Sequence, residues 1–401
     1  MIPYLNSKIF GRDIAMSSDL TYPNPPQFFG ADGATGLATY IGGPNIGYSD
    51  GAPFISAALP WEPFPTAKTS VPPVNKNEKM WGMTYGYFAN RGEIKSAEGI
   101  ESQERMYKLN NNWVCLTIVN YQDTYHSTRI YPDHLATPTE GDIKEFVKRA
   151  HKRGVKVCLK PMVHSRDNVW RAHIGFPDLN MDDLNAYWGP WFESYKNFIL
   201  NYAEIAQECG AEMLCIGCEM LGTEHRKYDW EYIIKEVRRV YKGKIVYNTN
   251  HDHEDDQQWF ELCDYLGTSA YYPVGAEYLD GPVDNSYDSL IKRWWDIRYR
   301  LDAIAKDRGK QFIFMEVGCR SVMNASAHPW DFTESLSYDE DEQLNFYMSC
   351  MEVFKDDPYF AGVFWWDWPT FLPKKHGADF YIIDKKAEDY LQQFYGAMNN
   401  G

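Results

Sequence analysis

The chain has 401 residues, of which 44% are hydrophobic and 16% aromatic, and its formal net charge is −16. Acidic side chains number 56 against 40 basic ones, so the chain lacks the cationic excess with which proteins bind nucleic acid or anionic membrane surfaces. The length allows one large domain with additional segments.

The targeting and redox features of the sequence predict a cytoplasmic protein. The first residues show no apolar segment behind a basic start, and no run of 18 apolar residues occurs that could span a membrane. Several of the eight cysteines lie inside apolar runs, which favours free thiols over a disulfide framework. A leader removed ahead of this sequence would make secretion an alternative.

The N-terminal part of the chain differs from the rest in composition. Eleven of the 22 prolines precede residue 75, and prolines of this density exclude regular helices and central strands. The same stretch contains large aromatic residues such as Phe28 and Trp61, which disordered segments seldom carry. We therefore expect residues 1–75 to form an irregular arm packed on a second unit, residues 76–401.

From residue 76 onward, short apolar runs alternate with amphipathic ones. The apolar runs are typical of strands that are covered on both faces of a parallel sheet. Eight strands are predicted: Met80–Tyr87, Trp113–Asn120, Val155–His164, Met213–Glu219, Lys244–Asn250, Tyr265–Tyr272, Gln311–Gly318 and Gly362–Trp368.

The segments between these runs have the spacing of helices. Ile143, Phe146, Val147 and Ala150 recur at i, i+3, i+4 and i+7, and Gly154 follows at the expected end of the helix. Strands that alternate with helices in this way predict an α/β fold, a (β/α)8 TIM barrel with an irregular proline-rich N-terminal extension. A doubly wound sheet is the alternative, but no phosphate-binding loop follows an early strand.

Two glutamates stand at equivalent places in the pattern. Glu219 ends the fourth predicted strand and Glu316 lies at the end of the seventh, and barrel enzymes carry their chemistry at these carboxyl ends. Carboxylates on strands four and seven can face each other across the barrel opening and flank one glycosidic bond. The alternative is that each glutamate is a structural ion-pair partner.

The local sequences around the two glutamates resemble clan A glycoside hydrolases, and most closely the β-mannanases of glycoside hydrolase family 113. The matching segments are Leu159-Lys160-Pro161, Trp170-Arg171, Ile216-Gly217-Cys218-Glu219, Glu316-Val317-Gly318 and Trp365-Trp366-Asp367-Trp368. The resemblance covers residues 80 to 370. It implies retaining hydrolysis of β-1,4-mannosidic bonds, with Glu219 as acid/base and Glu316 as nucleophile.

The chain also departs from the pattern of this family. Cys218 precedes the acid/base, where the family favours threonine, and Met162 and His164 stand where the family tends to carry histidine and an acid. These differences leave the two glutamates in place, but they leave the exact sugar open.

Further residues are expected to bind the substrate. The resemblance implies that Tyr271 hydrogen-bonds the nucleophile, and that a tryptophan of the last strand forms an apolar floor under a sugar ring. Since side chains alternate along a strand, Trp366 and Trp368 are expected on one face and Trp365 on the other. The polar or amphipathic candidates near the predicted opening are Asn120, Lys160, His164, Trp170, Arg171 and Asn250.

No cofactor or metal is expected. The run His251-Asp-His-Glu-Asp-Asp256 lacks the fixed helical spacing of a zinc motif. Cys215 and Cys218 match C-x-x-C, but three positions apart on a strand they should point to opposite faces, and no second such pair completes a zinc site.

The sequence thus predicts an endo-β-1,4-mannanase acting on a β-linked oligo- or polysaccharide, with no nucleic-acid or membrane partner. The alternatives are another clan A β-glycosidase, such as an exo-β-mannosidase, a β-glucanase or a xylanase, and a barrel that only binds carbohydrate. A metal-dependent barrel hydrolase is a weaker alternative, because only His164 lies at a strand end where such a ligand is needed.

Overall fold

The computed structural model describes residues 73, 78–176, 185–276, 282–375 and 377–400. Apart from Pro73, the expected arm over residues 1–75 lies outside the described residues. Within the described ranges, no helix has both the length and the apolar character needed to cross a bilayer.

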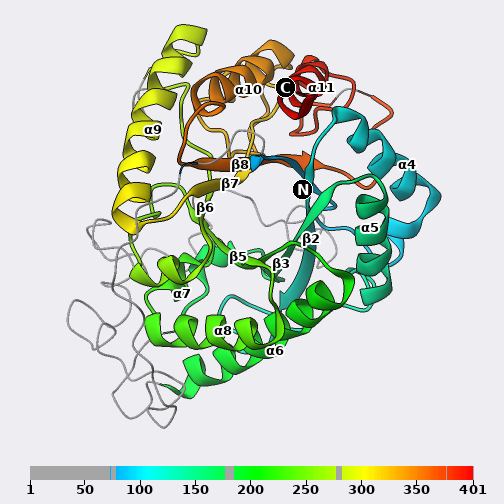
Figure 1. Cartoon of the computed structure of the whole chain (residues 1–401), viewed down its shortest axis with the longest axis vertical. Helices are drawn as coiled ribbons and strands as arrows, with labels where there is room; N and C mark the ends of the chain where they lie inside the picture. The colour runs from blue at the N-terminus through cyan, green and yellow to red at the C-terminus, as the bar shows by residue number, and fades with distance from the viewer. Residues whose placement is uncertain (1–72, 74–77, 177–184, 277–281, 376, 401) are drawn as a thin grey trace.

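Eight parallel strands form a closed barrel in chain order, as Figure 1 shows with the strands around the centre and the helices outside them. The predicted (β/α)8 barrel is thereby confirmed. β1 closes the ring by pairing with β8 as well as with β2, and Met80 lies opposite Gly362. The strands are β1 (Met80–Tyr85), β2 (Trp113–Gln122), β3 (Lys156–Ser165), β4 (Met213–Cys218), β5 (Lys244–Asn250), β6 (Tyr265–Ser269), β7 (Phe312–Val317) and β8 (Phe360–Trp368).

The helices lie around the outside of the barrel (Figure 1). They are α4 (Ala97–Met106), α5 (Glu140–Lys152), α6 (Asn185–Cys209), α7 (Leu221–Glu224), α8 (Lys227–Val240), α9 (Tyr287–Arg308), α10 (Glu340–Phe354) and α11 (Lys386–Asn400). α5 shows why they form: a capping box joins Thr139 and Asp142 at its start, and its apolar positions are buried. Between β5 and β6 the chain forms a short 3-10 helix, Gln258–Leu262, in place of a longer α-helix.

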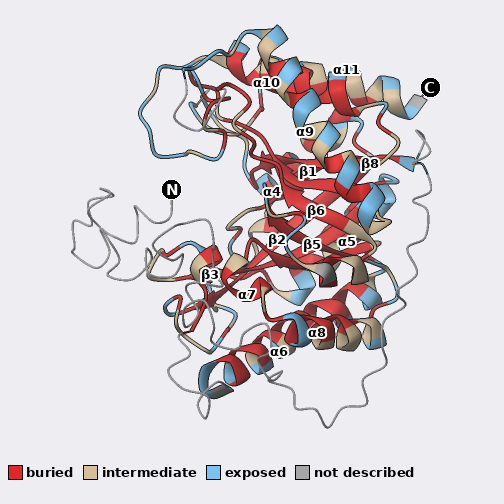
Figure 2. Ribbon diagram, turned by 90° about the vertical axis from the view of Figure 1, so that its left-hand side faces the viewer, coloured by how far each residue is buried: buried red, intermediate tan, exposed pale blue. Residues whose placement is uncertain are grey.

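The core has two parts, and the strands separate them. A large cluster fills the space between the strands and the helices, while a smaller one fills the inside of the barrel. Cys115, Cys158 and Cys215 belong to the inner cluster, and all eight cysteines are free. Figure 2 shows the strands largely buried, with most exposed residues on the outer faces of the helices and in loops. Lys156 and Lys244, the first residues of β3 and β5, are exposed. Because the strands are parallel, their carboxyl ends meet at one edge of the barrel.

Candidate active site

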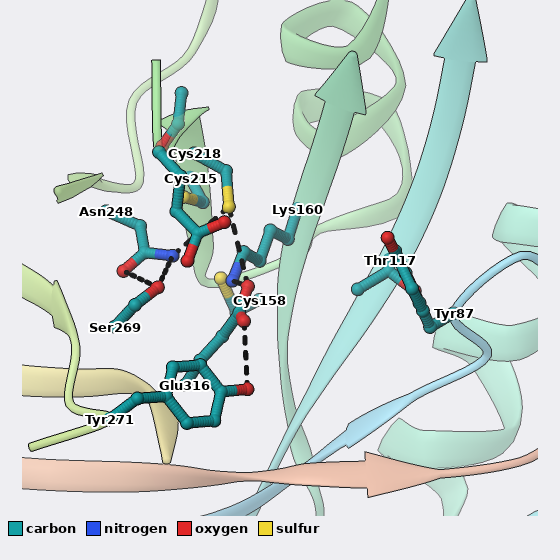
Figure 3. A network of polar contacts seen from close by, with 12 residues as sticks. Tyr87, Thr117, Cys158, Lys160, Cys215, Cys218, Asn248, Ser269, Tyr271 and Glu316 are labelled. Atoms are coloured by element: carbon teal, nitrogen blue, oxygen red, sulfur yellow. Dashed lines mark hydrogen bonds and ion pairs between the residues drawn. The ribbon is translucent and has the colours of Figure 1, made fainter. Parts of the chain in front are cut away.

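Glu316 lies in β7 with its carboxylate facing into the barrel, and it is 4% exposed. One oxygen, Oε1, forms an ion pair with the ammonium of Lys160 from β3 and accepts a weaker contact from the Cys218 thiol, with the sulfur at 3.4 Å. The other oxygen, Oε2, accepts a hydrogen bond of 3.1 Å from the hydroxyl of Tyr271 (Figure 3). Three donors, from β3, from the end of β4 and from the segment after β6, thus fix the orientation of this carboxylate.

The electrostatic surroundings keep these donors in their protonated forms. Burial by itself lowers the pKa of Lys160, but the charges of nearby groups, including Glu316, outweigh it and raise that pKa well above its ordinary value. Burial and the charge of Glu316 raise the pKa of Tyr271 well above its ordinary value. Glu316 therefore faces an ammonium and a phenolic proton donor.

Glu219 follows β4 directly and is 7% exposed. Its backbone has a left-handed conformation, with φ of 52°, and its amide donates to the carbonyl of Asn248 at 2.7 Å. Its carboxylate oxygen Oε2 accepts hydrogen bonds from the guanidinium of Arg171 at 2.7 Å and from the indole of Trp170 at 3.2 Å. Both donors come from the segment after β3, so two neighbouring strand ends build this side of the site.

Arg171 determines the charge of Glu219. Burial raises the pKa of this carboxyl, but the Arg171 guanidinium, a hydrogen bond from Ser269, Lys160 and the Trp170 indole together hold it below its ordinary value. Without substrate, Glu219 is therefore ionised near neutral pH.

Tyr87 connects the surroundings of the two glutamates. Its hydroxyl accepts a hydrogen bond of 3.2 Å from Arg171, and its ring packs edge-on against Trp366 with centroids 4.5 Å apart. Burial raises the pKa of Tyr87 to about 12, and the charges of Glu316 and Glu219 both contribute to this increase. Sequence reasoning missed Tyr87, although its place as the last residue of the first predicted strand was an available signal.

Asn248 and Ser269 were also missed. The amide of Asn248 donates to Ser269 at 3.1 Å and to the sulfur of Cys218 at 3.2 Å, and these contacts are drawn beside Glu316 in Figure 3. Asn248 lies two positions before Asn250 on β5, so the period-two spacing of a strand places both on the same face.

Two further predicted residues lie at the carboxyl ends of their strands. His164, on β3, is half-buried between the rings of Phe88 and Tyr121, and burial together with Arg171 and Arg166 lowers its pKa to about 3. Asn250 ends β5 and is 5% exposed. In the described part of the chain, neither the Nε2 atom of His164 nor the Oδ1 atom of Asn250 has a hydrogen-bond partner.

Asn120 and Trp368 do not point toward the opening, which corrects the expectation for both. Asn120 accepts a hydrogen bond of 2.6 Å from Tyr202 of α6, so it faces the surrounding helices. Trp368 is fully buried, and its indole donates to the hydroxyl of Ser102 in α4 at 3.0 Å. Both side chains contribute to the contact between barrel and helices and lie away from the two glutamates.

Irregular strand pairing explains the error for Trp368. Met83 pairs with Trp365 and Tyr85 pairs with Trp368, so three steps along β8 match two steps along β1. The extra residue ends the strict alternation of faces. Trp366 therefore points inward, with the Lys160 ammonium 6.0 Å from its ring centroid, whereas Trp368 points outward.

The same effect occurs at the C-x-x-C pair. The pairing of β4 with β5 shifts between Cys215 and Cys218, and both side chains lie inside the barrel, not on opposite faces as expected (Figure 3). Both cysteines are free.

The described residues offer no group of three His, Cys, Asp or Glu side chains that could hold a metal ion. In the acidic run after β5, His253 pairs with Asp256, and Glu254 accepts hydrogen bonds from Thr268 and Tyr272. These groups make contacts within the protein.

The family model described as Glycoside Hydrolase Family 113 matches residues 83–386, more than half of the chain. A solved GH113 β-mannanase from Alicyclobacillus acidocaldarius, in complex with ManMIm, is 32% identical with a TM-score of 0.72, and the match covers 80% of this chain and 98% of that one. A second GH113 β-1,4-mannanase structure is 30% identical with the same TM-score, covering 80% and 99%.

More distant structures share the fold alone. A β-glucuronidase from Faecalibacterium prausnitzii is 14% identical with a TM-score of 0.53, over 80% of this chain and 49% of that chain. A search of curated proteins found no match.

Proposed function

This chain belongs to glycoside hydrolase family 113, and we propose that it cleaves β-1,4-mannosidic bonds in mannan or manno-oligosaccharides through Glu316 as nucleophile and Glu219 as general acid/base. It is a glycoside hydrolase with the barrel of its family. The observation that carries the residue assignment is the pair of buried glutamates after β4 and in β7. Each is held by its own cation, Arg171 for Glu219 and Lys160 for Glu316.

In the first step, the carboxylate of Glu316 attacks the anomeric carbon of the sugar. The bond from this carbon to the glycosidic oxygen breaks, the electron pair moves to that oxygen, and the oxygen takes the proton from the carboxyl group of Glu219. The products are a glycosyl ester on Glu316 and a free leaving sugar.

In the second step, Glu219 acts as a base. It removes a proton from a water molecule whose oxygen attacks the anomeric carbon, and the bond to Glu316 breaks with the electron pair returning to the carboxylate. The two displacements each invert the anomeric carbon, so the net result is retention. The Lys160 ammonium and the Tyr271 hydroxyl stabilise Glu316 as the carboxylate that attacks and later departs.

The acid role requires a proton on Glu219, although Arg171 favours its ionised form. A bound sugar excludes the remaining water from a carboxyl that is only 7% exposed, which strengthens the contribution of burial to its pKa. We therefore assign to Glu219 a protonation state that depends on substrate binding.

The first test compares wild type with Glu316→Gln and Glu219→Gln on linear β-1,4-mannan and mannohexaose. We expect wild type to release shorter products whose first-formed reducing ends are β by NMR. Each variant should lose at least about 10²-fold in kcat, because the nucleophile or the positioned proton is lost. Retained cleavage by Glu316→Gln would refute the nucleophile assignment.

A second measurement separates the two roles. With azide, Glu219→Ala should form a β-glycosyl azide, because azide needs no base and attacks the glycosyl ester on Glu316. Glu316→Ala should instead form the α-azide from an activated substrate, because azide then replaces the nucleophile itself. Exchanged products would mean that the two assignments are reversed.

A further inference from the structure

Trp330 forms an exposed aromatic surface at the edge of the barrel that carries the two glutamates. It lies in the loop between β7 and α10 and is 36% exposed. Its ring stacks on His251, with centroids 5.6 Å apart and planes at 23°. Since His251 directly follows the last residue of β5, loops from two different strand ends meet in this stack.

The loop that carries Trp330 is anchored at Ser326, four residues before the tryptophan. After β6, the amide of Gly275 donates to the carbonyl of Ser326 at 2.7 Å, and a Cβ at Gly275 would lie 2.2 Å from the Ser326 hydroxyl, so only glycine permits this approach. The amide of Ser326 in turn donates to Glu342 of α10 at 3.0 Å. A ring held in this way loses little conformational freedom when a ligand binds.

The stack of Trp330 on His251 lies on the Glu219 side of the site. β5 pairs with β4, and the carbonyl of Asn248 in β5 accepts the amide hydrogen of Glu219. The carboxylate of Glu219 is also among the charges that act on His251. The Trp366 ring lies instead near Lys160, the partner of Glu316.

A general acid protonates the glycosidic oxygen, so the leaving sugar lies on the side of the acid. The apolar face of a pyranose packs on aromatic rings, and a ring whose other face is already stacked presents a flat surface to it. We propose that Trp330, backed by His251, binds a mannosyl unit of the leaving group. This inference rests on the proposed function and adds to it a binding site for the part of the chain that departs.

The test uses two substrates of which only one carries sugar beyond the scissile bond. Mannohexaose places mannosyl units there, whereas β-mannobiosyl fluoride places only fluoride. For Trp330→Ala we expect kcat/KM on mannohexaose to fall about tenfold, as for the loss of an aromatic contact, while kcat/KM on the fluoride stays within about twofold. Trp330→Phe, which keeps a ring, should recover most of the loss.

Trp295→Ala is the matched control, because Trp295 is 37% exposed but lies on α9 at the outside of the barrel. It should behave as wild type on both substrates. The proposal would be overturned if Trp330→Ala lowered kcat/KM equally on both substrates, or if it left kcat/KM at the wild-type value on both.

A binding measurement keeps this inference distinct from the proposed function. If wild type cleaved neither substrate, the proposed function would fail. Calorimetric titration of Glu316→Gln with mannohexaose, with and without Trp330→Ala, then still decides on the binding site. Binding that is weakened about tenfold by Trp330→Ala supports the site, and binding that is unchanged or absent in both contradicts it.

Discussion

At the scale of single residues, the ion pair between Arg171 and Glu219 controls the proton on the proposed acid. Arg171 is itself buried and bridges three groups: the carboxylate of Glu219, the hydroxyl of Tyr87 and the carbonyl of Val163. Because its guanidinium holds the pKa of Glu219 below the ordinary value against the effect of burial, its removal leaves burial as the main influence.

We therefore expect Arg171→Gln to raise the pKa of Glu219 and to move the alkaline limb of kcat/KM to higher pH. A pH profile on mannohexaose measures this shift. Arg166→Gln is the control, because Arg166 pairs with Asp133 and makes no contact with Glu219. An unchanged limb in Arg171→Gln, or a limb at lower pH, would show that another group controls the proton.

The residue types in a sequence reveal the chemistry of a site more readily than the direction in which each side chain points. Lys160 and Arg171 could be named in advance, because charged side chains at apolar strand ends need partners. Their partners could not be assigned, since which carboxylate each cation meets depends on the closure of the ring. Tyr87 was missed for a related reason: its importance arises from Arg171 and Trp366, which are distant in sequence.

At the scale of the elements, the irregular positions in β4 and β8 decide which side chains reach the site. Both strands carry regular apolar runs, so a strict period of two was the natural expectation. Near its carboxyl end, each strand has one more residue than the paired stretch of its neighbour. In β4 this irregularity lies just before Cys218, and in β8 it lies between Trp365 and Trp368. Such bulges re-aim side chains. Gly217 lies within the irregular stretch of β4 and was an available signal, whereas β8 has no glycine or proline between Trp365 and Trp368 that would have marked its bulge.

This difference predicts separate effects for two tryptophans of β8. Trp368→Phe removes the indole donor to Ser102 and part of a fully buried ring, so the free energy of unfolding should fall by about 2 kcal/mol with KM unchanged. Trp366→Phe should instead raise KM for mannohexaose. Denaturant unfolding and steady-state kinetics on both variants check this, and a similar rise of KM in Trp368→Phe would contradict the assigned directions.

At the scale of the whole molecule, the stability should depend on pH through Glu224. This residue of α7 is 1% exposed, and Tyr247 and Thr249 donate to its carboxyl at 2.8 and 3.1 Å. Burial raises its pKa from 4.5 to about 7, although these hydrogen bonds and His253 act in the opposite direction. Asp256 adds to the increase.

Between these two pKa values, Glu224 is protonated in the folded chain but ionised in the unfolded chain. The free energy of unfolding should therefore fall as pH rises from about 4.5 to 7, by about 3 kcal/mol in total, and level off above pH 7. Glu224→Gln should remove this part of the pH dependence of the free energy of unfolding. Urea unfolding at a series of pH values measures it, with the exposed Glu208→Gln as control; an identical slope in Glu224→Gln and wild type would refute the role.

The architecture as a whole was the most predictable feature. All eight strands occur within a few residues of their expected bounds, because each is an apolar run that the outer helices must cover. The connection between β5 and β6 is different: its 3-10 helix buries Trp259 and Phe260 without a repeating apolar stripe, so periodicity could not identify it.

The closure of the barrel also has a consequence for how the protein is made. Met80 of β1 pairs with Gly362 of β8, 362 − 80 = 282 residues further along the chain. At synthesis rates of about 5 to 20 residues per second, β1 is made roughly 15 to 55 s before β8, the strand that pairs with its other edge. During that interval β1 exposes an unpaired edge, so the nascent chain needs protection at this edge until translation has passed β8.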